Sequence, residues 1–141
     1  MDRVTNILLV EDDEIDVLNV RRAFAKGGIE NPLFHAADGL AALQMLRDGT
    51  VPRERRLVLL DLNMPRMSGI EFLAELRADP ELSQTAVVVL TTSDEERDRI
   101  EAYNFHVAGY LLKPVRFVGF IELMATLNRY WTLMELPPPS T

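Results

Sequence analysis

Four short apolar runs in this sequence are each followed at once by side chains that can do chemistry. In chain order these are Glu11 and Asp12 after residues 7–10, Asp61 after 57–60, Thr91 after 86–90 and Lys113 after 110–112. Carboxylates gathered in one pocket suit a hard cation, because Mg²⁺ prefers one or two carboxylates together with waters and a phosphate oxygen. An ammonium group and a hydroxyl can bind further phosphoryl oxygens, and a carboxylate can act as the nucleophile. These residue types therefore indicate Mg²⁺-dependent phosphoryl chemistry, provided that the fold brings them together.

The segments that carry these residues alternate between strand and helix patterns. Five strands are predicted, three from continuously apolar runs at residues 7–10, 57–60 and 86–90 and two from weaker runs at 33–36 and 110–112. Helical spacing fills the intervals, with helices predicted around residues 17–24, 40–46 and 70–76, after Ser93, and from 117 to about 134. This alternation predicts an α/β fold, in which one parallel sheet is covered by helices on both faces. Ligands of such sheets bind at the carboxyl ends of the strands, so the reactive side chains should meet at one edge.

Local signals mark some of the helix ends. Ser68 with Glu71, and Ser93 with Glu96, have the spacing of a capping box, in which the serine and the acid each bind the other's backbone N–H. Prolines from position 137 onward should end the last helix, because proline cannot continue the hydrogen-bond ladder.

Composition narrows the class of protein. With 141 residues the chain fits one domain, with a core over about residues 6–134, a proline-rich tail over 135–141 and no output domain. Fifteen Lys and Arg against 22 Asp and Glu give a net charge of −7, which argues against binding to nucleic acid. The chain contains no cysteine, so disulfides, thiolate metal sites and cysteine nucleophiles are excluded. It has no signal-peptide pattern and no apolar run near the ~20 residues of a membrane span, so we expect a cytoplasmic protein away from the membrane.

Several motifs together resemble the receiver domain of bacterial response regulators, the proteins of two-component systems that accept phosphate from histidine kinases. They are the acidic pair Glu11-Asp12, the run Asp61-Leu62-Asn63-Met64-Pro65, Thr91, and the run Tyr110-Leu111-Leu112-Lys113-Pro114. The resemblance extends over residues 6–133 and implies a flavodoxin-like (βα)5 doubly wound parallel sheet with strand order 2-1-3-4-5. It also implies a stand-alone response regulator that accepts a phosphoryl group and has no independent substrate turnover as an enzyme.

The resemblance assigns the acidic residues to an acceptor and a metal site. Asp61 matches the phospho-acceptor, and it would share a Mg²⁺ or Mn²⁺ ion with Asp12. Glu11 would act on the metal through water, and Asn63 would contribute its backbone carbonyl. The acyl phosphate would be lost by self-dephosphorylation.

The resemblance also assigns the residues that respond to phosphate. Thr91 and Lys113 match the hydroxyl and the cation that bind the phosphoryl group, and Tyr110 matches the aromatic residue whose rotamer follows Thr91. The peptide bond from Lys113 to Pro114 is expected to be cis, an isomer that is accessible mainly before proline.

A narrower resemblance concerns the partner. The run from Leu90 to Ser93, the pair Asp79-Pro80, and the pair Tyr130-Trp131 near the end of the last helix are similar to those of small regulators that partner bacterial phytochrome kinases. The implied partner is a light-sensing histidine kinase, a bacteriophytochrome.

The last helix carries more apolar residues than one core face requires. Phe120, Leu123, Leu127, Tyr130 and Met134 follow each other at steps of three and four residues, the spacing of an a/d seam. We interpret them as the surface of a homodimer, through which a protein without an output domain could signal. The alternative is one broad apolar stripe that packs on the sheet.

Other functions would use similar residues. A Mg²⁺-dependent phosphohydrolase or nucleotidyl-transfer domain usually needs a second carboxylate two residues after Asp61, where this chain has Asn63. A receiver-like module that works without phosphorylation would not need the full set of site residues. A flavin-binding module of similar topology is disfavoured, because the acids after residue 10 would repel the cofactor phosphate.

Overall fold

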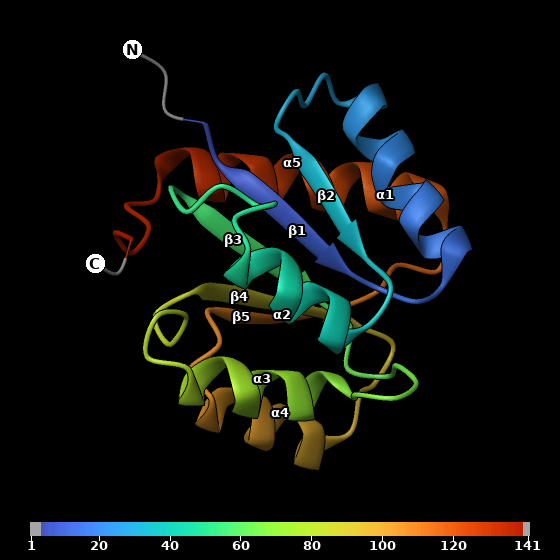
Figure 1. Cartoon of the computed structure of the whole chain (residues 1–141). Helices are drawn as coiled ribbons and strands as arrows, with labels where there is room; N and C mark the ends of the chain where they lie inside the picture. Colours follow the sequence, from blue (N-terminus) through green and yellow to red (C-terminus); the bar gives the residue numbers. More distant parts are fainter. Residues whose placement is uncertain (1–3, 140–141) are drawn as a thin grey trace.

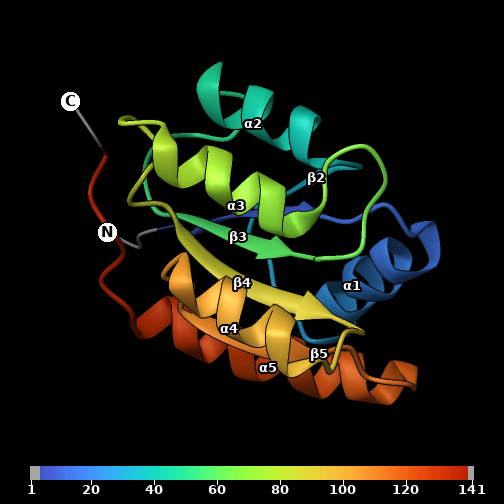
Figure 2. The ribbon, with the colours of Figure 1, turned by 90° about the horizontal axis from the view of Figure 1, so that it is seen from below.

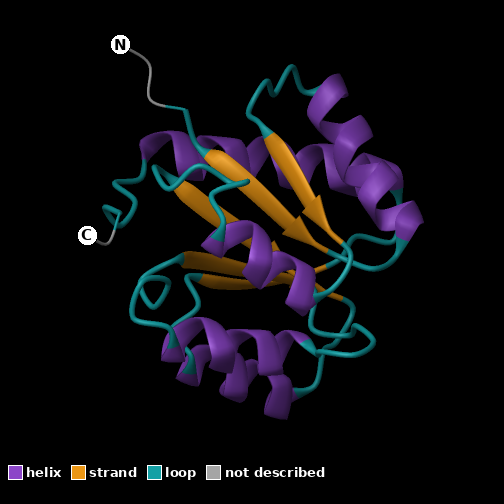
Figure 3. Cartoon of the chain, viewed as in Figure 1, coloured by secondary structure: helices purple, strands orange, loops and turns teal. Residues whose placement is uncertain are grey.

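The computed structural model describes residues 4–139, which form ten elements that alternate strictly between strand and helix (Figure 1, Figure 3). In chain order they are β1 (Asn6–Val10), α1 (Glu14–Lys26), β2 (Leu33–Ala36), α2 (Gly39–Arg47), β3 (Arg56–Leu60), α3 (Gly69–Ala78), β4 (Ala86–Thr91), α4 (Glu96–Asn104), β5 (Gly109–Leu112) and α5 (Phe117–Leu133). All five predicted strands are present, and the predicted α/β class is confirmed.

The strands form one sheet in the order β2-β1-β3-β4-β5, and every neighbouring pair is parallel. This is the expected flavodoxin-like order. Figure 2 shows α2 and α3 side by side over one face of the sheet, and α4 packs next to α3. On the opposite face α1 and α5 pack against each other.

The apolar runs of the central strands are continuous because helices cover both faces of the sheet. Along β1 the side chains alternate between two cores, with Ile7 and Leu9 packed beneath α1 and α5 and Leu8 and Val10 beneath α2 and α3. Successive residues of a strand point to opposite faces, so a strand buried on both faces needs apolar residues throughout.

Side-chain caps begin three of the helices. Asp13 accepts hydrogen bonds from the first turn of α1, and Asp38 does the same for α2. The capping box of Ser68 and Glu71 at α3 is confirmed. Caps of this kind satisfy backbone N–H groups that have no partner within the helix.

The second predicted capping box is wrong. The helix α4 begins at Glu96 after the cap residue Glu95, and no side chain caps its N–H groups. The hydroxyl of Ser93 donates to the carboxylate of Asp98 at 2.5 Å, so it is engaged with the side chain of a later residue.

Part of the homodimer surface that the sequence predicted on α5 is buried in the core. Phe120 and Leu127 are buried under the sheet together with Met124 and Trp131, so they cannot belong to an exposed dimer surface. These four residues recur at the three- and four-residue steps of one helical face, and that face covers the core. From the predicted surface Leu123 and Tyr130 are partly exposed, and Met134, which follows the helix, is 36% exposed.

Arg55 fastens the end of α5 to the amino edge of the sheet. Its guanidinium donates to the hydroxyl of Thr5 and to the carbonyls of Trp131 (2.8 Å) and Met134 (3.2 Å). Its backbone has a φ of 48°, in the left-handed region, which turns the chain sharply before β3.

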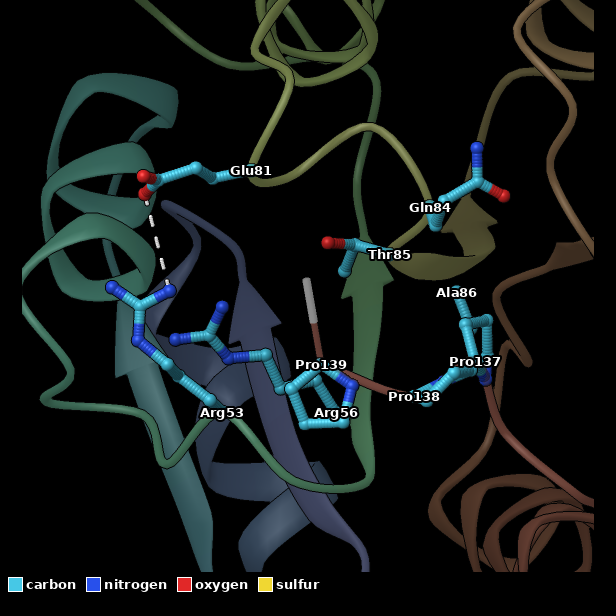
Figure 4. Close-up of a pocket in the computed structure, with 9 residues that line it drawn as sticks. All are labelled: Arg53, Arg56, Glu81, Gln84, Thr85, Ala86, Pro137, Pro138 and Pro139. Atoms are coloured by element: carbon cyan, nitrogen blue, oxygen red, sulfur yellow. Dashed lines mark ion pairs between the residues drawn. The ribbon is translucent and has the colours of Figure 1, made fainter. Parts of the chain in front are cut away.

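The chain after α5 runs back along this amino edge, where Pro137 to Pro139 lie near Arg56 and Ala86 (Figure 4). The cavity between them has a volume of about 30 Å³, which admits roughly one water molecule and no larger ligand. Among the described residues, no helix combines the length and the hydropathy that a membrane span needs.

Candidate phosphoryl-acceptor site

The carboxyl ends of the strands bring the reactive side chains to the edge opposite the proline segment. Glu11 follows β1, Asp61 follows β3, Thr91 is the last residue of β4, and Lys113 follows β5. The arrowheads of β1 and β2 in Figure 1 point toward this edge. Because all strands are parallel, side chains that are far apart in sequence meet at this edge of the sheet.

The ammonium group of Lys113 is the centre of the site. Its Nζ lies 2.6 Å from Glu11 Oε1, 2.7 Å from Asp16 Oδ2 and 3.5 Å from Asp61 Oδ2. Burial by itself would lower the pKa of Lys113, but the hydrogen bonds to Asp16 and Glu11 outweigh it and the pKa lies above its ordinary value. Lys113 is therefore a fixed positive charge among three acids.

Glu11 has a partner at each carboxylate oxygen and at its backbone carbonyl, and Lys113 is the partner of Oε1. Its second carboxylate oxygen accepts from the N–H of Asp13 at 3.1 Å, and its backbone carbonyl lies 2.7 Å from Nε2 of His35 on β2. Burial raises the pKa of Glu11 to about 7; the hydrogen bond from Lys113 opposes that rise, and the negative charge of Asp61 adds to it.

Three carboxylates form a group that fits a hard cation. One oxygen from each of Glu11, Asp12 and Asp61 lies within 4.8 Å of the others. Glu11 and Asp61 are buried and Asp12 is exposed, so a bound ion would keep one side open to water and to a phosphate oxygen. Oxygen ligands in an open arrangement match the preference of Mg²⁺ and Mn²⁺.

The backbone fixes Asp61 closely. Its N–H donates to the carbonyl of Val10 at 3.0 Å, and its Oδ1 accepts weakly from the N–H of Asn63 at 3.4 Å. The start of α3 touches the same segment at Gly69, where a Cβ would lie 2.5 Å from the carbonyl oxygen of Asp61. Only glycine fits there without moving Asp61 or its neighbour Leu62.

A hydroxyl and an aromatic ring meet at the loop after β4. Thr91 is completely buried and accepts from the N–H of Ser93 at 3.3 Å. Tyr110 on β5 donates its hydroxyl to the carbonyl of Ser93 at 2.8 Å, and Arg99 of α4 lies 5.9 Å from the centre of the Tyr110 ring. Ser93 thus connects Thr91 with Tyr110, the two residues that the family resemblance assigns to a switch.

The predicted cis bond before Pro114 is wrong, because every peptide bond among residues 4–139 is trans. The trans isomer is the more stable one even before proline, by about 0.5–1 kcal/mol. Here Lys113 is held by its N–H, which donates to the carbonyl of Thr91 at 2.8 Å, and the ring of Pro114 fits against Gly119. A Cβ at Gly119 would lie 2.6 Å from Cβ of Pro114, so the absence of a side chain there allows the close approach of the proline.

Sequence reasoning missed Asp16, which contacts Lys113 as closely as Glu11 does. An acid in the first turn of a helix has an ordinary explanation in the helix dipole, so nothing in the motifs drew attention to it. The available signal was its place four residues after Asp12, on the same helix face as the buried Val20.

The family model of the response regulator receiver domain matches residues 7–125 of the chain. The chain therefore belongs to the response regulator receiver domain family. Phosphorylation on an aspartate and binding of Mg²⁺ or Mn²⁺ are typical of this family. Membership makes the protein a response regulator and not a classical enzyme, and the phosphohydrolase and nucleotidyl-transfer alternatives are not favoured.

Two relatives are similar to this chain over most of their length. Rcp1, a response regulator of Synechocystis sp., is 38% identical over 128 residues, which cover 89% of this chain and 87% of Rcp1. FilR2, a probable methanogenesis regulatory protein of Methanothrix harundinacea, is 38% identical over 127 residues, which cover 89% of this chain and 82% of FilR2.

Two solved structures have the same fold. The phosphorylated cyanobacterial phytochrome response regulator RcpA has a TM-score of 0.84 at 33% identity, covering 96% of this chain and 99% of RcpA. The Mn²⁺-bound form of Rcp1 has a TM-score of 0.80 at 37% identity, covering 94% of this chain and 99% of Rcp1. The chain is thus homologous to small response regulators that consist of a receiver domain.

Proposed function

We propose that this protein accepts a phosphoryl group on Asp61 and passes the signal on through its own surface. The observation that carries the proposal is the contact of Lys113 with both Asp61 and Glu11, which brings together groups that follow three different strands. The exposed side of Asp12 leaves room for a donor to approach.

In the proposed reaction a carboxylate oxygen of Asp61 attacks phosphorus while the bond from phosphorus to the donor breaks. With a phosphohistidine donor, the electron pair of the broken P–N bond stays on the imidazole. Lys113 would neutralise one phosphoryl oxygen, and the Thr91 hydroxyl would bind another. A Mg²⁺ or Mn²⁺ ion held by Asp12, Asp61, the carbonyl of Asn63 and, through water, Glu11 would neutralise charge on the phosphoryl group.

We propose that the change is read out by Tyr110. Its hydroxyl is bonded to the carbonyl of Ser93, two residues from Thr91, so a movement of Thr91 toward a phosphoryl oxygen would disturb this bond. Slow hydrolysis of the acyl phosphate in place would reset the switch.

The proposed donor is a histidine kinase of the phytochrome type, acting in the cytoplasm. Support comes from RcpA, which is described as a cyanobacterial phytochrome response regulator, and from a bacteriophytochrome response regulator that is 33% identical with a TM-score of 0.69. FilR2, which is named for methanogenesis, and Rcp1 are each 38% identical to this chain, so the test of the proposed donor is phosphotransfer to Asp61 from a purified phytochrome kinase.

The output surface proposed here is a homodimer interface next to the buried face of α5. Leu123, Tyr130 and Met134 are the members of the predicted surface that keep exposed area. An isologous contact between two copies would bury them without any further domain.

The acceptor is tested by intact-mass measurement after incubation with acetyl phosphate and Mg²⁺. We expect the wild type to gain one phosphoryl group and Asp61→Asn to gain none, because the amide lacks the nucleophilic oxygen. Glu14→Gln is the matched control, since it also removes one acid near the site but lies exposed on α1 and should react normally. An adduct that persists in Asp61→Asn would disprove the assignment.

A further inference from the structure

We propose that Asp16 is a positioning residue that competes with the phosphoryl group for Lys113. Asp16 and Lys113 lie 97 positions apart in sequence, and their side chains meet at 2.7 Å. The proposal rests on the proposed function, because it concerns how Lys113 becomes available to a phosphoryl group on Asp61.

The position of Asp16 is set by the start of α1. Asp13 caps the helix by accepting from the N–H groups of Ile15 (2.9 Å) and Asp16 (3.2 Å), which fixes the backbone of the first turn. The next residue, Val17, is buried against the core and prevents rotation of the helix. With both constraints in place, the carboxylate of Asp16 reaches the ammonium group after β5.

The contact is more than the usual acid at a helix start. A first-turn acid that only interacts with the helix dipole can point into water. Asp16 instead has a side chain that is 21% exposed and contacts a lysine whose own side chain is 7% exposed. This is a partly buried, charge-assisted hydrogen bond between two elements, which fixes the direction of the lysine.

Of the three acids around Lys113, Asp61 has the longest and therefore weakest contact with the ammonium group. An ammonium group has three N–H donors. Two of them serve Glu11 at 2.6 Å and Asp16 at 2.7 Å, and Asp61 lies at 3.5 Å. The third donor can reach a phosphoryl oxygen on Asp61, but the ammonium group then shares its charge with two closer acids, which oppose its movement toward that oxygen.

Asp16 is the partner that Lys113 can leave more easily. Glu11 is 2% exposed and would lose a buried partner that water cannot readily replace, whereas Asp16 is 21% exposed and can be solvated after the contact breaks. The contact thus opposes binding of the phosphoryl group, and removing the charge of Asp16 should strengthen that binding.

The test is titration of beryllofluoride, a phosphoryl mimic, into protein saturated with Mg²⁺, followed by calorimetry. We expect Asp16→Asn to bind the anion roughly fivefold more tightly than the wild type, because one competing charge is gone. Asp16→Ser should behave in the same way. Asp16→Glu, which restores a carboxylate, should return the affinity to within about twofold of the wild type.

Glu14→Gln is the matched control, because it removes the same charge from the same helical turn without touching Lys113. We expect it to change the affinity less than Asp16→Asn does. In unligated protein the ¹⁵N signal of the Lys113 ammonium group should shift in Asp16→Asn and stay in place in Glu14→Gln.

The outcomes separate the two proposals. If the wild type binds no beryllofluoride, the proposed function fails. If the wild type binds it and Asp16→Asn binds with equal or lower affinity, or no more tightly than Glu14→Gln, the role of Asp16 is refuted and the acceptor site stands.

Discussion

At the scale of single residues, Glu11 occupies an unusual place among the acids of the site. It is 2% exposed, it contacts the ammonium group of Lys113, and its pKa is raised to about 7, chiefly by burial. The group therefore exchanges its proton near neutral pH, where an ordinary glutamate is already fully ionised. This links the charge of the proposed metal site to pH.

We predict that Mg²⁺ binds more weakly as pH falls from 8 to 6. Above a pKa of about 7 Glu11 is a carboxylate that attracts the ion, and below it the neutral acid does not, so binding must release a proton. The expected loss is up to roughly tenfold in affinity over this range. Calorimetric titration of the wild type and Glu11→Gln measures it.

Glu11→Gln should bind Mg²⁺ more weakly at pH 8 and with little pH dependence. His35→Gln is the control, because His35 bonds the backbone carbonyl of Glu11 and contributes no carboxylate to the site. If the pH dependence persists unchanged in Glu11→Gln, the glutamate is not responsible for it.

Residue types at strand ends made most of the site predictable. Glu11, Asp61 and Lys113 each directly follow an apolar run, and parallel strands carry such positions to a common edge. Asp16 was not predictable in this way, because it lies inside a helix and its partner is set by the rotation of α1 against the sheet. The trans bond before Pro114 was not predictable either, because the expectation of a cis bond came from the family resemblance and both isomers are accessible before proline.

At the scale of elements, the start of α3 controls the backbone of the acceptor. A Cβ on Gly69 would lie 2.5 Å from the carbonyl oxygen of Asp61 and 2.6 Å from Cα of Leu62. Both obstacles are backbone atoms, which cannot rotate away as a flexible side chain could. Helix α3 can therefore approach the end of β3 only with glycine at this position.

We predict that Gly69→Ala destabilises the protein by about 2 kcal/mol, the typical cost of overpacking, and slows phosphorylation of Asp61. Chemical denaturation and intact-mass time courses measure the two effects. Gly49→Ala is a useful comparison, because nothing lies within 4 Å of its Cβ direction and any cost there comes from its φ of 81° alone. Normal phosphorylation in a stably folded Gly69→Ala protein would contradict the prediction.

The faces of α5 were harder to predict than its ends. The apolar residues Phe120 and Leu127 fit an a/d seam by spacing, yet the same positions also fit the stripe that packs on the sheet. Which stripe is buried depends on how α5 packs against α1, a contact between elements distant in sequence. Some helix ends, in contrast, follow from local signals, as Ser68 does at the start of α3, although the same signal at Ser93 was wrong.

At the scale of the whole molecule, the remaining exposed apolar area beside α5 is the proposed route of the signal. We predict that beryllofluoride with Mg²⁺ increases the dimer fraction and that Leu123→Glu reduces it, because a charge would be buried at the contact. Analytical ultracentrifugation at several protein concentrations measures this. Val118→Glu is the control, since Val118 is 62% exposed on α5 but is not part of the predicted surface.

A wild-type protein that stays monomeric at every concentration, with and without beryllofluoride, would rule out the homodimer. Equal losses in Leu123→Glu and Val118→Glu would place the contact elsewhere on α5. In neither case would the acceptor assignment change, because it depends on Asp61 and is measured by mass.

The hydrogen bonds by which Arg55 joins the two ends of the fold have a consequence for the order of folding. One guanidinium bonds Thr5 ahead of the first strand and the carbonyls of Trp131 and Met134 at the end of the last helix. During synthesis Thr5 and Arg55 emerge long before Trp131, so Arg55 must wait for most of its partners until α5 has left the ribosome. The nascent chain would then keep the core beneath α5 open to chaperones until α5 is available, and we expect the complete fold to form only after α5 has left the ribosome.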